Sequence, residues 1–230
     1  MNEGLSRRVF IAGAGAIAVA GCTTVEVPER KPVASLPPAA PAMYQALPEE
    51  QFPVPAVNIA ELDRRFWRVL VDYPSDEKIG TLIVDTPNKY LYHVRPNGRA
   101  VRYGIGVGRE GFAWSGRAIV AYKRAWPRWT PPDDMIARQT ELEKYSMRNG
   151  GMPPGLANPL GARALYIHEN GRDTLYRLHG TAEAFSIGNA VSSGCIRLLN
   201  QDVIHLHEQV RDGSPILVIP DPSMMVSHVG

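Results

Sequence analysis

Residues 164–181 read ALYIHENGRDTLYRLHGT and contain two apolar runs on either side of a turn. Ala164 to His168 and Thr174 to Leu178 flank the tetrapeptide Glu169-Asn170-Gly171-Arg172, so this stretch predicts a β-hairpin. His179 then falls at the end of the second strand, where a side chain is held on rigid backbone. The hairpin therefore presents His179 as a candidate functional residue.

Further short runs of β-branched and aromatic residues lie on both sides of this hairpin. They predict strands over 81–85, 90–94, 101–107, 118–123 and 215–219, with Asn97-Gly98 as a second hairpin turn. Asn200 to Val210 is predicted as the one clear helix, capped by Asn200, with Val203, Leu206 and Val210 buried, and ended by Gly213. Residues 59–71 have the apolar spacing of a short helix, although 66–73 would also suit a strand. Many short strands and one late helix predict a mainly β fold, a sandwich or barrel.

Residues 126–160 interrupt this pattern with prolines, glycines and tryptophans. The segment begins with Trp126-Pro127-Arg128-Trp129-Thr130-Pro131-Pro132 and later contains Gly150-Gly151-Met152-Pro153-Pro154-Gly155. A long irregular insertion in a folded domain is usually functional, so we expect a lid or the wall of a cleft. Trp114, Trp126 and Trp129 are candidates to line that cleft, and core packing is the alternative.

The first 22 residues have the character of an export signal, which does not contribute to the fold. Arg7 and Arg8 precede an apolar run, residues 10–20, that is too short to span about 30 Å of hydrocarbon as a helix. Residues 6–11 resemble a twin-arginine signal, and Val19-Ala20-Gly21-Cys22 resembles a bacterial lipobox. The resemblance implies lipidation of Cys22; the alternative is an ordinary cleaved signal with an incidental cysteine.

Residues 23–55 contain prolines 28, 32, 37, 38, 41, 48, 53 and 55 and no glycine. Such a segment favours polyproline II, so we predict a semi-rigid linker, with plain disorder as the alternative. The remaining chain divides into an N-terminal extension (56–77), a main folded domain (78–220) and a tail (221–230). With a formal net charge of +2 and no basic block, the sequence predicts no nucleic-acid partner.

Cys195 is the second of only two cysteines and lies in Ser192-Ser193-Gly194-Cys195-Ile196-Arg197. An unpaired thiol in an exported protein is exposed to oxidation, so its presence points to chemistry. A nucleophilic thiol needs a base, a group that orients the base, and donors facing the oxyanion. His179 is the candidate base and the Gly180 carbonyl its candidate partner. The alternative is a small buried cysteine beside a structural histidine.

The order of these motifs resembles the L,D-transpeptidase (YkuD) catalytic domain family. His179-Gly180-Thr181 precedes the Ser192–Arg197 motif, and the likeness extends through Gly104–Gly108 and Asn158–Gly161, covering roughly residues 78–220. Ser193 departs from the family pattern, which most often has histidine there. This departure bears on substrate contacts and on tuning of the thiol.

The resemblance implies a peptidoglycan enzyme with a β-rich domain, no metal and no organic cofactor. Cys195 would attack the third residue of a tetrapeptide stem, expel D-alanine and pass the acyl group to an amine, forming a 3→3 cross-link. Gly194, Ser193, Ser192 and Gly180 would bind the substrate or the oxyanion. Arg197 would hold a substrate carboxylate through its planar donor fork, or would form a structural salt bridge.

Other outcomes for the same residues stay open. Water would turn the acyl-enzyme into a hydrolase, and a protein amine would attach an envelope protein to peptidoglycan. A non-catalytic wall-binding lipoprotein is the alternative of another class. The expected location is the periplasm, with a membrane anchor at Cys22; Thr23 after the lipobox, in place of Asp, favours the outer membrane.

Overall fold

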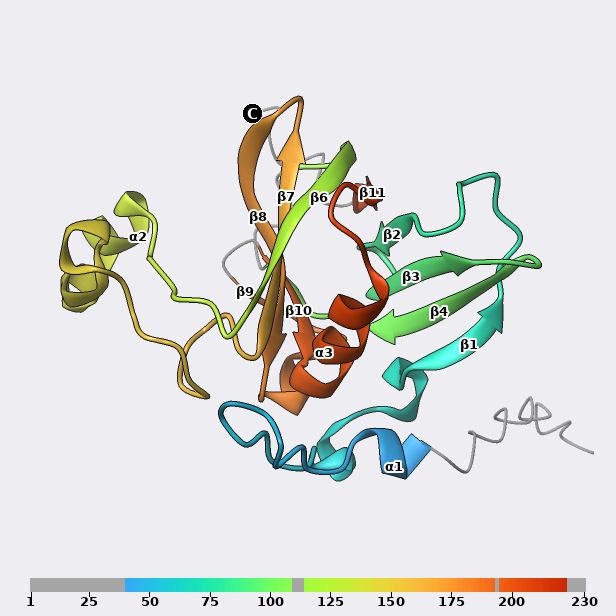
Figure 1. The fold of residues 1–230 in the computed structure, drawn as a ribbon, viewed down its shortest axis with the longest axis horizontal. Coiled ribbons are helices and arrows are strands. Elements are labelled where there is room, and N and C mark those ends of the chain that lie inside the picture. The colour runs from blue at the N-terminus through green and yellow to red at the C-terminus, as the bar shows by residue number, and fades with distance from the viewer. Residues whose placement is uncertain (1–39, 109–113, 193–194, 223–230) are drawn as a thin grey trace, which may run out of the picture. The chain divides into compact units, whose positions relative to one another are not determined.

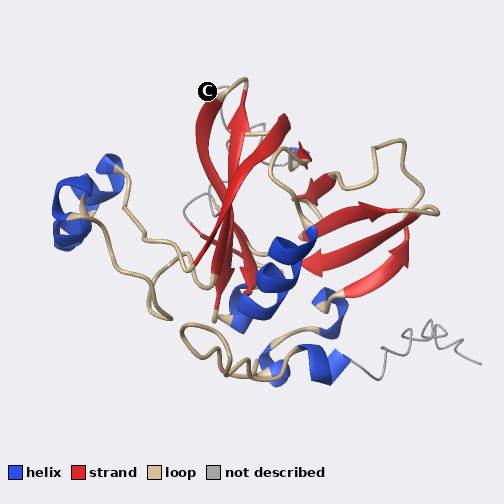
Figure 2. Cartoon of the chain, in the orientation of Figure 1, coloured by secondary structure: helices blue, strands red, loops and turns tan. Residues whose placement is uncertain are grey.

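A computed structural model describes residues 40–108, 114–192 and 195–222 (Figure 1). Strands dominate this part of the chain, and its helices are few and short (Figure 2). In spatial order, the large sheet consists of β1 (Val69–Asp72), β4 (Arg99–Gly104), β3 (Tyr90–Arg95), β2 (Leu82–Asp85), β11 (Pro215–Ile219), β6 (Gly116–Ala125), β7 (Arg163–Glu169), β8 (Arg172–Thr181) and β10 (Ile196–Leu199). The predicted mainly β fold is therefore confirmed.

The remaining elements are a small sheet and short helices. β5 (Val107–Gly108) pairs in parallel with β9 (Ala190–Ser192). The α-helices are α1 (Ala40–Met43), α2 (Asp133–Arg138) and α3 (Asn200–Gln209). The 3₁₀ helices are η1 (Ile59–Glu61), η2 (Arg64–Phe66), η3 (Thr140–Tyr145), η4 (Met147–Asn149) and η5 (Ala184–Ser186). None of the helices in the described residues is long and apolar enough to cross a bilayer.

Both predicted hairpins form, and their turns explain why. Asn170 and Gly171 have φ of 49° and 79°, and Asn97 and Gly98 have φ of 60° and 63°. In the β7–β8 hairpin Glu169 pairs with Arg172, so Asn170 and Gly171 form a two-residue turn that requires positive φ at both positions, and Asn-Gly meets this with least strain. In the β3–β4 hairpin Arg95 pairs with Arg99, so the loop has three residues, and its last two, Asn97 and Gly98, adopt positive φ. The β7–β8 register then pairs Ala164 with His179 at the open end of the hairpin.

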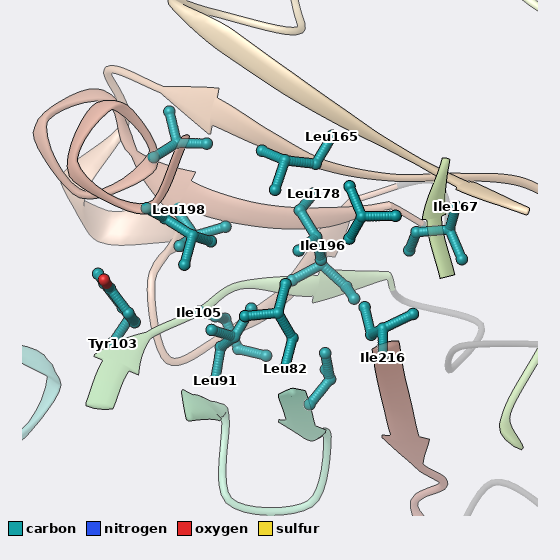
Figure 3. Close-up of a cluster of buried hydrophobic side chains, with 14 of the residues drawn as sticks. Leu82, Leu91, Tyr103, Ile105, Leu165, Ile167, Leu178, Ile196, Leu198 and Ile216 are labelled. Carbon is teal, nitrogen blue, oxygen red and sulfur yellow. The ribbon is translucent and has the colours of Figure 1, made fainter. Parts of the chain in front are cut away.

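The two ends of the large sheet share one hydrophobic core, which α3 covers. Figure 3 shows residues of β2, β3 and β4 facing residues of β7, β8 and β10: Leu82, Leu91 and Tyr103 on one side, Leu165, Ile167, Leu178, Ile196 and Leu198 on the other. All are fully buried. Full burial of each such side chain stabilises the fold by about 1.5–3 kcal/mol. A bridge between Gly106 and Arg197 closes the sheet at one point, as in a barrel.

Helix α3 has the predicted buried stripe but different ends. Val203, Leu206 and Val210 are all at most 2% exposed. Leu199, not Asn200, is the N-cap residue, and the helix ends at Gln209, before the turn that contains Gly213. Asn200 does not cap the helix, because its Oδ1 accepts a hydrogen bond from a distant backbone amide described below.

The segment 59–71 is not a continuous helix. It forms η1 and η2, each begun by an Asx side chain that accepts a backbone amide, and then enters β1. The alternative of a strand near 66–73 was closer, because β1 covers Val69–Asp72 and pairs with β4. Pairing with a neighbouring strand has overridden the helical spacing.

Residues 40–55 are folded onto the domain, contrary to the expected linker over 23–55. Tyr44 and Val54 are 1% and 2% exposed, and the Tyr44 hydroxyl donates to Asp202 Oδ2 at 3.1 Å. Glu50 accepts a bidentate pair from Arg163 at 2.7 and 2.9 Å. The prolines did not hold this segment away from the domain, because Tyr44, Val54 and Glu50 find partners on it. The expected signal (1–22), the rest of the linker and Cys22 lie outside the described residues.

The insertion 126–160 is anchored at its ends. Trp126 is 5% exposed, packs on Phe52 and donates its indole N–H to Glu50 at 2.9 Å. Trp129 is half-buried, and Trp114 packs against the main core. Core packing therefore accounts for Trp126 and Trp114. Between the ends, α2, η3 and η4 contain no buried residue, and α2 stands away from the sheet in Figure 1. A role as a lid stays a prediction.

Candidate active site

The candidate base and nucleophile come from neighbouring strands that are joined in parallel. β8 pairs with β10 so that Leu178 lies opposite Ile196 and His179 lies opposite Arg197. Side chains alternate between the two faces of a strand. Leu178 and Ile196 point into the core, so His179 and Arg197 share the other face. Cys195 directly precedes β10 and therefore lies at the same end of this strand pair.

His179 is held in one tautomer by its own neighbour. Its Nδ1 lies 3.0 Å from the Gly180 carbonyl oxygen. A carbonyl only accepts, so this contact requires a proton on Nδ1 and leaves Nε2 as the basic atom. The Gly180 carbonyl is the orienting group that the sequence suggested. The imidazole is 4% exposed, and this burial lowers its pKa to about 4, against the hydrogen bond to Gly180. His179 is therefore neutral and ready to accept a proton at neutral pH.

The thiol of Cys195 is half-buried. Burial raises its pKa, and the hydrogen bond to the Arg177 backbone together with the charges of Arg177 and Arg197 opposes that rise. The resting pair is therefore a neutral thiol and a neutral imidazole. A cysteine nucleophile with a base in this state would form its thiolate during attack, by proton transfer to the base.

Gly180 is required for packing as well as for its carbonyl. A Cβ at this position would collide with Oδ1 of Asn200, which accepts the Ala162 amide at 2.9 Å. A Cβ at Gly161, where φ is 60°, would lie 2.5 Å from the same oxygen. Asn200 thus clamps the backbone on which His179 is mounted. The sequence predicted only a capping role for Asn200, and its place within the stretch that resembles the family was the one signal of a further role.

Asn158 braces the same end of the hairpin. Its amide donates to the carbonyls of Pro127 and Pro153 at 3.1 and 3.0 Å, and its Oδ1 accepts from Leu160 N at 2.9 Å. The Leu160 carbonyl in turn accepts from Gly180 N at 3.0 Å. The Asn158–Gly161 motif therefore connects the foot of the insertion to the backbone of the candidate base.

Arg197 forms an ion pair, so the salt-bridge alternative applies to part of its guanidinium. Its Nη1 lies 2.8 Å from Glu183 Oε2. Its backbone exchanges two hydrogen bonds of 2.9 Å with Gly106, where a Cβ would lie 2.5 Å from the Ser186 carbonyl oxygen. The Nε of Arg197 is buried without a hydrogen bond among the described residues. Arg197 thus ties β10 to the segments that surround it.

The other predicted site residues are only partly described. Ser192 is the last residue of β9, and Ser193 and Gly194 lie outside the described residues. Two other histidines are placed elsewhere: His93 is 2% exposed within β3, and His205 contacts the Tyr103 hydroxyl at 2.8 Å. In the parts of the chain that the structure describes, no three His, Cys, Asp or Glu side chains gather as a metal site.

Comparison with known proteins assigns the chain to a family. The profile of the YkuD family, described as the L,D-transpeptidase catalytic domain, matches residues 80–218. A relative named probable L,D-transpeptidase ErfK/SrfK, from Escherichia coli strain K12, is 33% identical over 144 residues, which is 61% of this chain and 44% of the relative. The chain thus matches under half of that relative's length.

Two solved structures are also similar. One is described as a probable carnitine operon oxidoreductase from Brucella melitensis; it is 37% identical, covers 70% of this chain and 99% of its own, and has a TM-score of 0.48. The other is an L,D-transpeptidase from Xylanimonas cellulosilytica, 17% identical, covering 64% of this chain and 63% of its own, with a TM-score of 0.42. The family profile spans most of the folded chain, including both halves of the His179 and Cys195 motif, and the protein belongs to the L,D-transpeptidase (YkuD) catalytic domain family.

Proposed function

We propose that this protein is a peptidoglycan L,D-transpeptidase in which Cys195 is the nucleophile and His179 is the general base. One observation carries the assignment of roles. His179 is buried, neutral and fixed by the Gly180 carbonyl on β8, while Cys195 leads into β10, the strand paired with β8. A base and a nucleophile on adjoining strands, with the base oriented by a third group, is the arrangement that covalent acyl transfer needs.

The first half of the proposed reaction forms a thioester. Cys195 Sγ attacks the carbonyl carbon of the third residue of a tetrapeptide stem, and its proton passes to His179 Nε2. The tetrahedral oxyanion accepts hydrogen bonds from backbone amides near the nucleophile, including that of Cys195. The C–N bond to D-alanine then breaks, and the imidazolium returns the proton to the departing amine.

The second half transfers the acyl group. An acceptor amine attacks the thioester carbon, His179 takes a proton from that amine, and the C–S bond breaks. His179 gives the proton back to the thiolate. With the side-chain amine of another stem as acceptor, the product is a 3→3 cross-link. Water or an amine of an envelope protein would give a free stem or a protein attached to the wall.

The substrate contacts of the proposal involve four further positions. Ser192, Ser193 and Gly194 precede the nucleophile and would line the acyl site. Arg197 is held by Glu183, and its charge lies close enough to oppose the burial of the Cys195 thiol. Arg197 therefore contributes positive potential where negative charge develops on sulfur and oxygen.

The proposed location follows from the N-terminal sequence. Export, lipidation at Cys22 and attachment to a membrane, the outer membrane being favoured, would place the domain in the periplasm beside peptidoglycan. Processing that is sensitive to globomycin and a lipid mass on a peptide that begins at Cys22 would support this location. A mature chain cleaved elsewhere, with Cys22 absent or unmodified, would exclude it.

Mass spectrometry of the intact protein tests the assignment of the nucleophile. Wild-type protein incubated with a tetrapeptide stem or a carbapenem should gain a covalent adduct, and Cys195→Ala should gain none. An adduct that persists in Cys195→Ala would refute the nucleophile. A folded wild-type protein without any adduct would favour the non-catalytic wall-binding lipoprotein.

Analysis of muropeptides after incubation with purified peptidoglycan separates the possible acceptors. The proposal predicts cross-linked dimers of a 3→3 type together with free D-alanine. Shortened stems without dimers would identify water as the acceptor, which makes the protein a hydrolase. Stems bound to an added envelope protein would identify a protein amine. The Cys195→Ala variant is the control in each reaction.

A further inference from the structure

Two arginines and two tyrosines form a continuous stack across β8, β7 and β6. The guanidinium carbon of Arg177 lies 4.5 Å from the centroid of the Tyr166 ring. The rings of Tyr166 and Tyr122 stack with centroids 4.3 Å apart and an interplanar angle of 16°. The guanidinium carbon of Arg124 lies 5.1 Å from the Tyr122 centroid. We call these four residues the Arg–Tyr ladder.

The strand register places the Arg–Tyr ladder on the catalytic face of the sheet. Tyr122 lies opposite Tyr166, which lies opposite Arg177. In the next row of that face, Arg124 lies opposite Ala164, which lies opposite His179. The core-facing residues of β7 and β8 alternate with these two rows. The ladder therefore begins beside Cys195 and runs across strands that are neighbours in Figure 1.

The two arginines of the ladder differ in charge balance. Arg177 forms hydrogen bonds of 2.7 and 2.8 Å to the two carboxylate oxygens of Asp173. A bulge in β8, where Leu175 has φ of 65°, brings Asp173 to the side of Arg177. Arg124 is exposed and has no ion pair among the described residues. The far end of the ladder thus carries a guanidinium that pairs with no carboxylate in the described part of the chain.

The length of the ladder suits a short peptide. From β8, which carries Arg177, to β6, which carries Arg124, there are two strand spacings, or roughly 10 Å at about 4.8 Å each. The three residues of a tetrapeptide stem that end at the acyl carbon span at most roughly 11 Å when extended. Each tyrosine ring is covered by a ring on one side and a guanidinium on the other, so the ring edges and hydroxyls remain for a ligand. Both tyrosines are half-buried and keep part of their surface accessible.

We propose that the Arg–Tyr ladder is a subsite for the stem peptide, in which Arg124 pairs with a free carboxylate of the peptide. The peptide would lie across the strands, with its acyl carbon at Cys195 and an anionic end at Arg124. The tyrosine hydroxyls would donate to its carbonyls. This inference rests on the proposed function, because it assigns the substrate of the same thiol a path over the sheet.

Steady-state kinetics of D-alanine release test the subsite. Arg124→Gln should raise KM for an anionic tetrapeptide stem about fivefold to tenfold and leave kcat unchanged, since an exposed charge-assisted contact contributes about 1–1.4 kcal/mol. Arg124→Lys should recover most of the affinity. Arg211→Gln, which removes an exposed arginine outside the ladder, is the matched control and should behave as wild type.

A second substrate isolates the charge. The same stem, with its carboxylates other than that of the terminal D-alanine converted to amides, should have a KM that Arg124→Gln does not change. An equal KM of wild type and Arg124→Gln for the anionic stem would overturn the subsite while leaving the proposed function intact. An equal rise for the amidated stem would also overturn it. Wild-type protein that releases no D-alanine would overturn both proposals.

Discussion

The end of the β7–β8 hairpin and the insertion 126–160 are adjacent along the chain but are held in very different ways. The last four residues of β8, Leu178–Thr181, are all buried. In the insertion, α2, η3 and η4 bury no residue, and Met147 is 82% exposed. Local stability follows the number of buried contacts. The candidate base therefore lies on backbone that opens rarely, and the insertion belongs to the low-stability end of the structure.

The two regions meet at Asn158–Gly161, where the insertion returns to the sheet before β7, so the difference in burial begins there. The Leu160 carbonyl accepts the Gly180 amide, and Asn158 holds two proline carbonyls of the insertion. The foot of the insertion thus shares the rigidity of the hairpin, and its tip does not. The effects of substitutions on activity and stability should therefore decrease from the hairpin end, through the anchored ends of the insertion (the foot), to α2, η3 and η4 (the tip).

The largest effect is expected at His179. His179→Asn should lower the rate of thioester formation by about 10²–10⁴-fold, because a positioned general base contributes that much. Stopped-flow acylation by a carbapenem measures this rate. His207→Asn, which replaces a half-buried histidine on α3, is the control. An acylation rate within about threefold of wild type would remove His179 from the mechanism.

The next effect is expected at Gly180. Gly180→Ala should reduce the free energy of unfolding by about 1–3 kcal/mol, because its Cβ would force Asn200 or the His179 backbone to move. Urea unfolding followed by circular dichroism measures the loss. Ala182→Ser, at an exposed position two residues further on, should be neutral. If Gly180→Ala is as stable as wild type, the Asn200 side chain can move away from the added Cβ without cost, and its contact with Gly180 is not a constraint.

The pH dependence of acylation tests the electrostatics of the hairpin end. The His179 pKa is lowered to about 4, so the base is unprotonated above that pH. Between pH 8 and 5 protonation of His179 should not lower the acylation rate. The rate should fall to about half at pH 4 and to about a tenth one pH unit lower. Between pH 6.5, about the pKa of histidine in the unfolded chain, and pH 4, His179 binds more protons in the unfolded chain than in the folded one. The free energy of unfolding therefore also decreases as the pH is lowered through this range. Circular dichroism at each pH separates unfolding from loss of the base; a midpoint near 6.5 would contradict the buried, neutral histidine.

At the foot of the insertion, Glu50→Gln should cost about 1 kcal/mol. The substitution keeps the shape but removes the charge that pairs with Arg163 and accepts the Trp126 indole. Thermal unfolding measures the change, and Glu49→Gln next to it is the matched control. Equal stabilities of the two variants would show that residues 40–55 add little to the anchor of the insertion.

The smallest effect is expected at the tip. Met147→Ser should change the free energy of unfolding by less than about 0.5 kcal/mol, since the side chain is 82% exposed. Chemical unfolding checks this value. A loss above 1 kcal/mol would indicate that the tip is packed, and the contrast with the hairpin would then disappear.

Much of the hairpin could be predicted because its signals are local. Asn170-Gly171 specifies the turn, and the apolar runs on either side of it specify the two strands. The insertion was recognised by composition alone, which does not say where a segment packs. The prediction of a linker was wrong over residues 40–55 because composition does not say where a segment packs. Prolines indicate a backbone preference, whereas Tyr44 and Glu50 are held by partners more than 100 residues away in the chain.

The sequence by itself determined the turns, the buried stripe of α3, the order of His179 and Cys195, and through them the family. These depend on residues close together in the chain, where periodicity and backbone preference act. The tertiary structure decided the rest: the parallel pairing of β8 with β10, the Asn200 clamp under Gly180, and the stack that joins Arg177 to Arg124. Such contacts depend on how strands distant in sequence bury a common core, and the register that results sets which polar side chains share the opposite face.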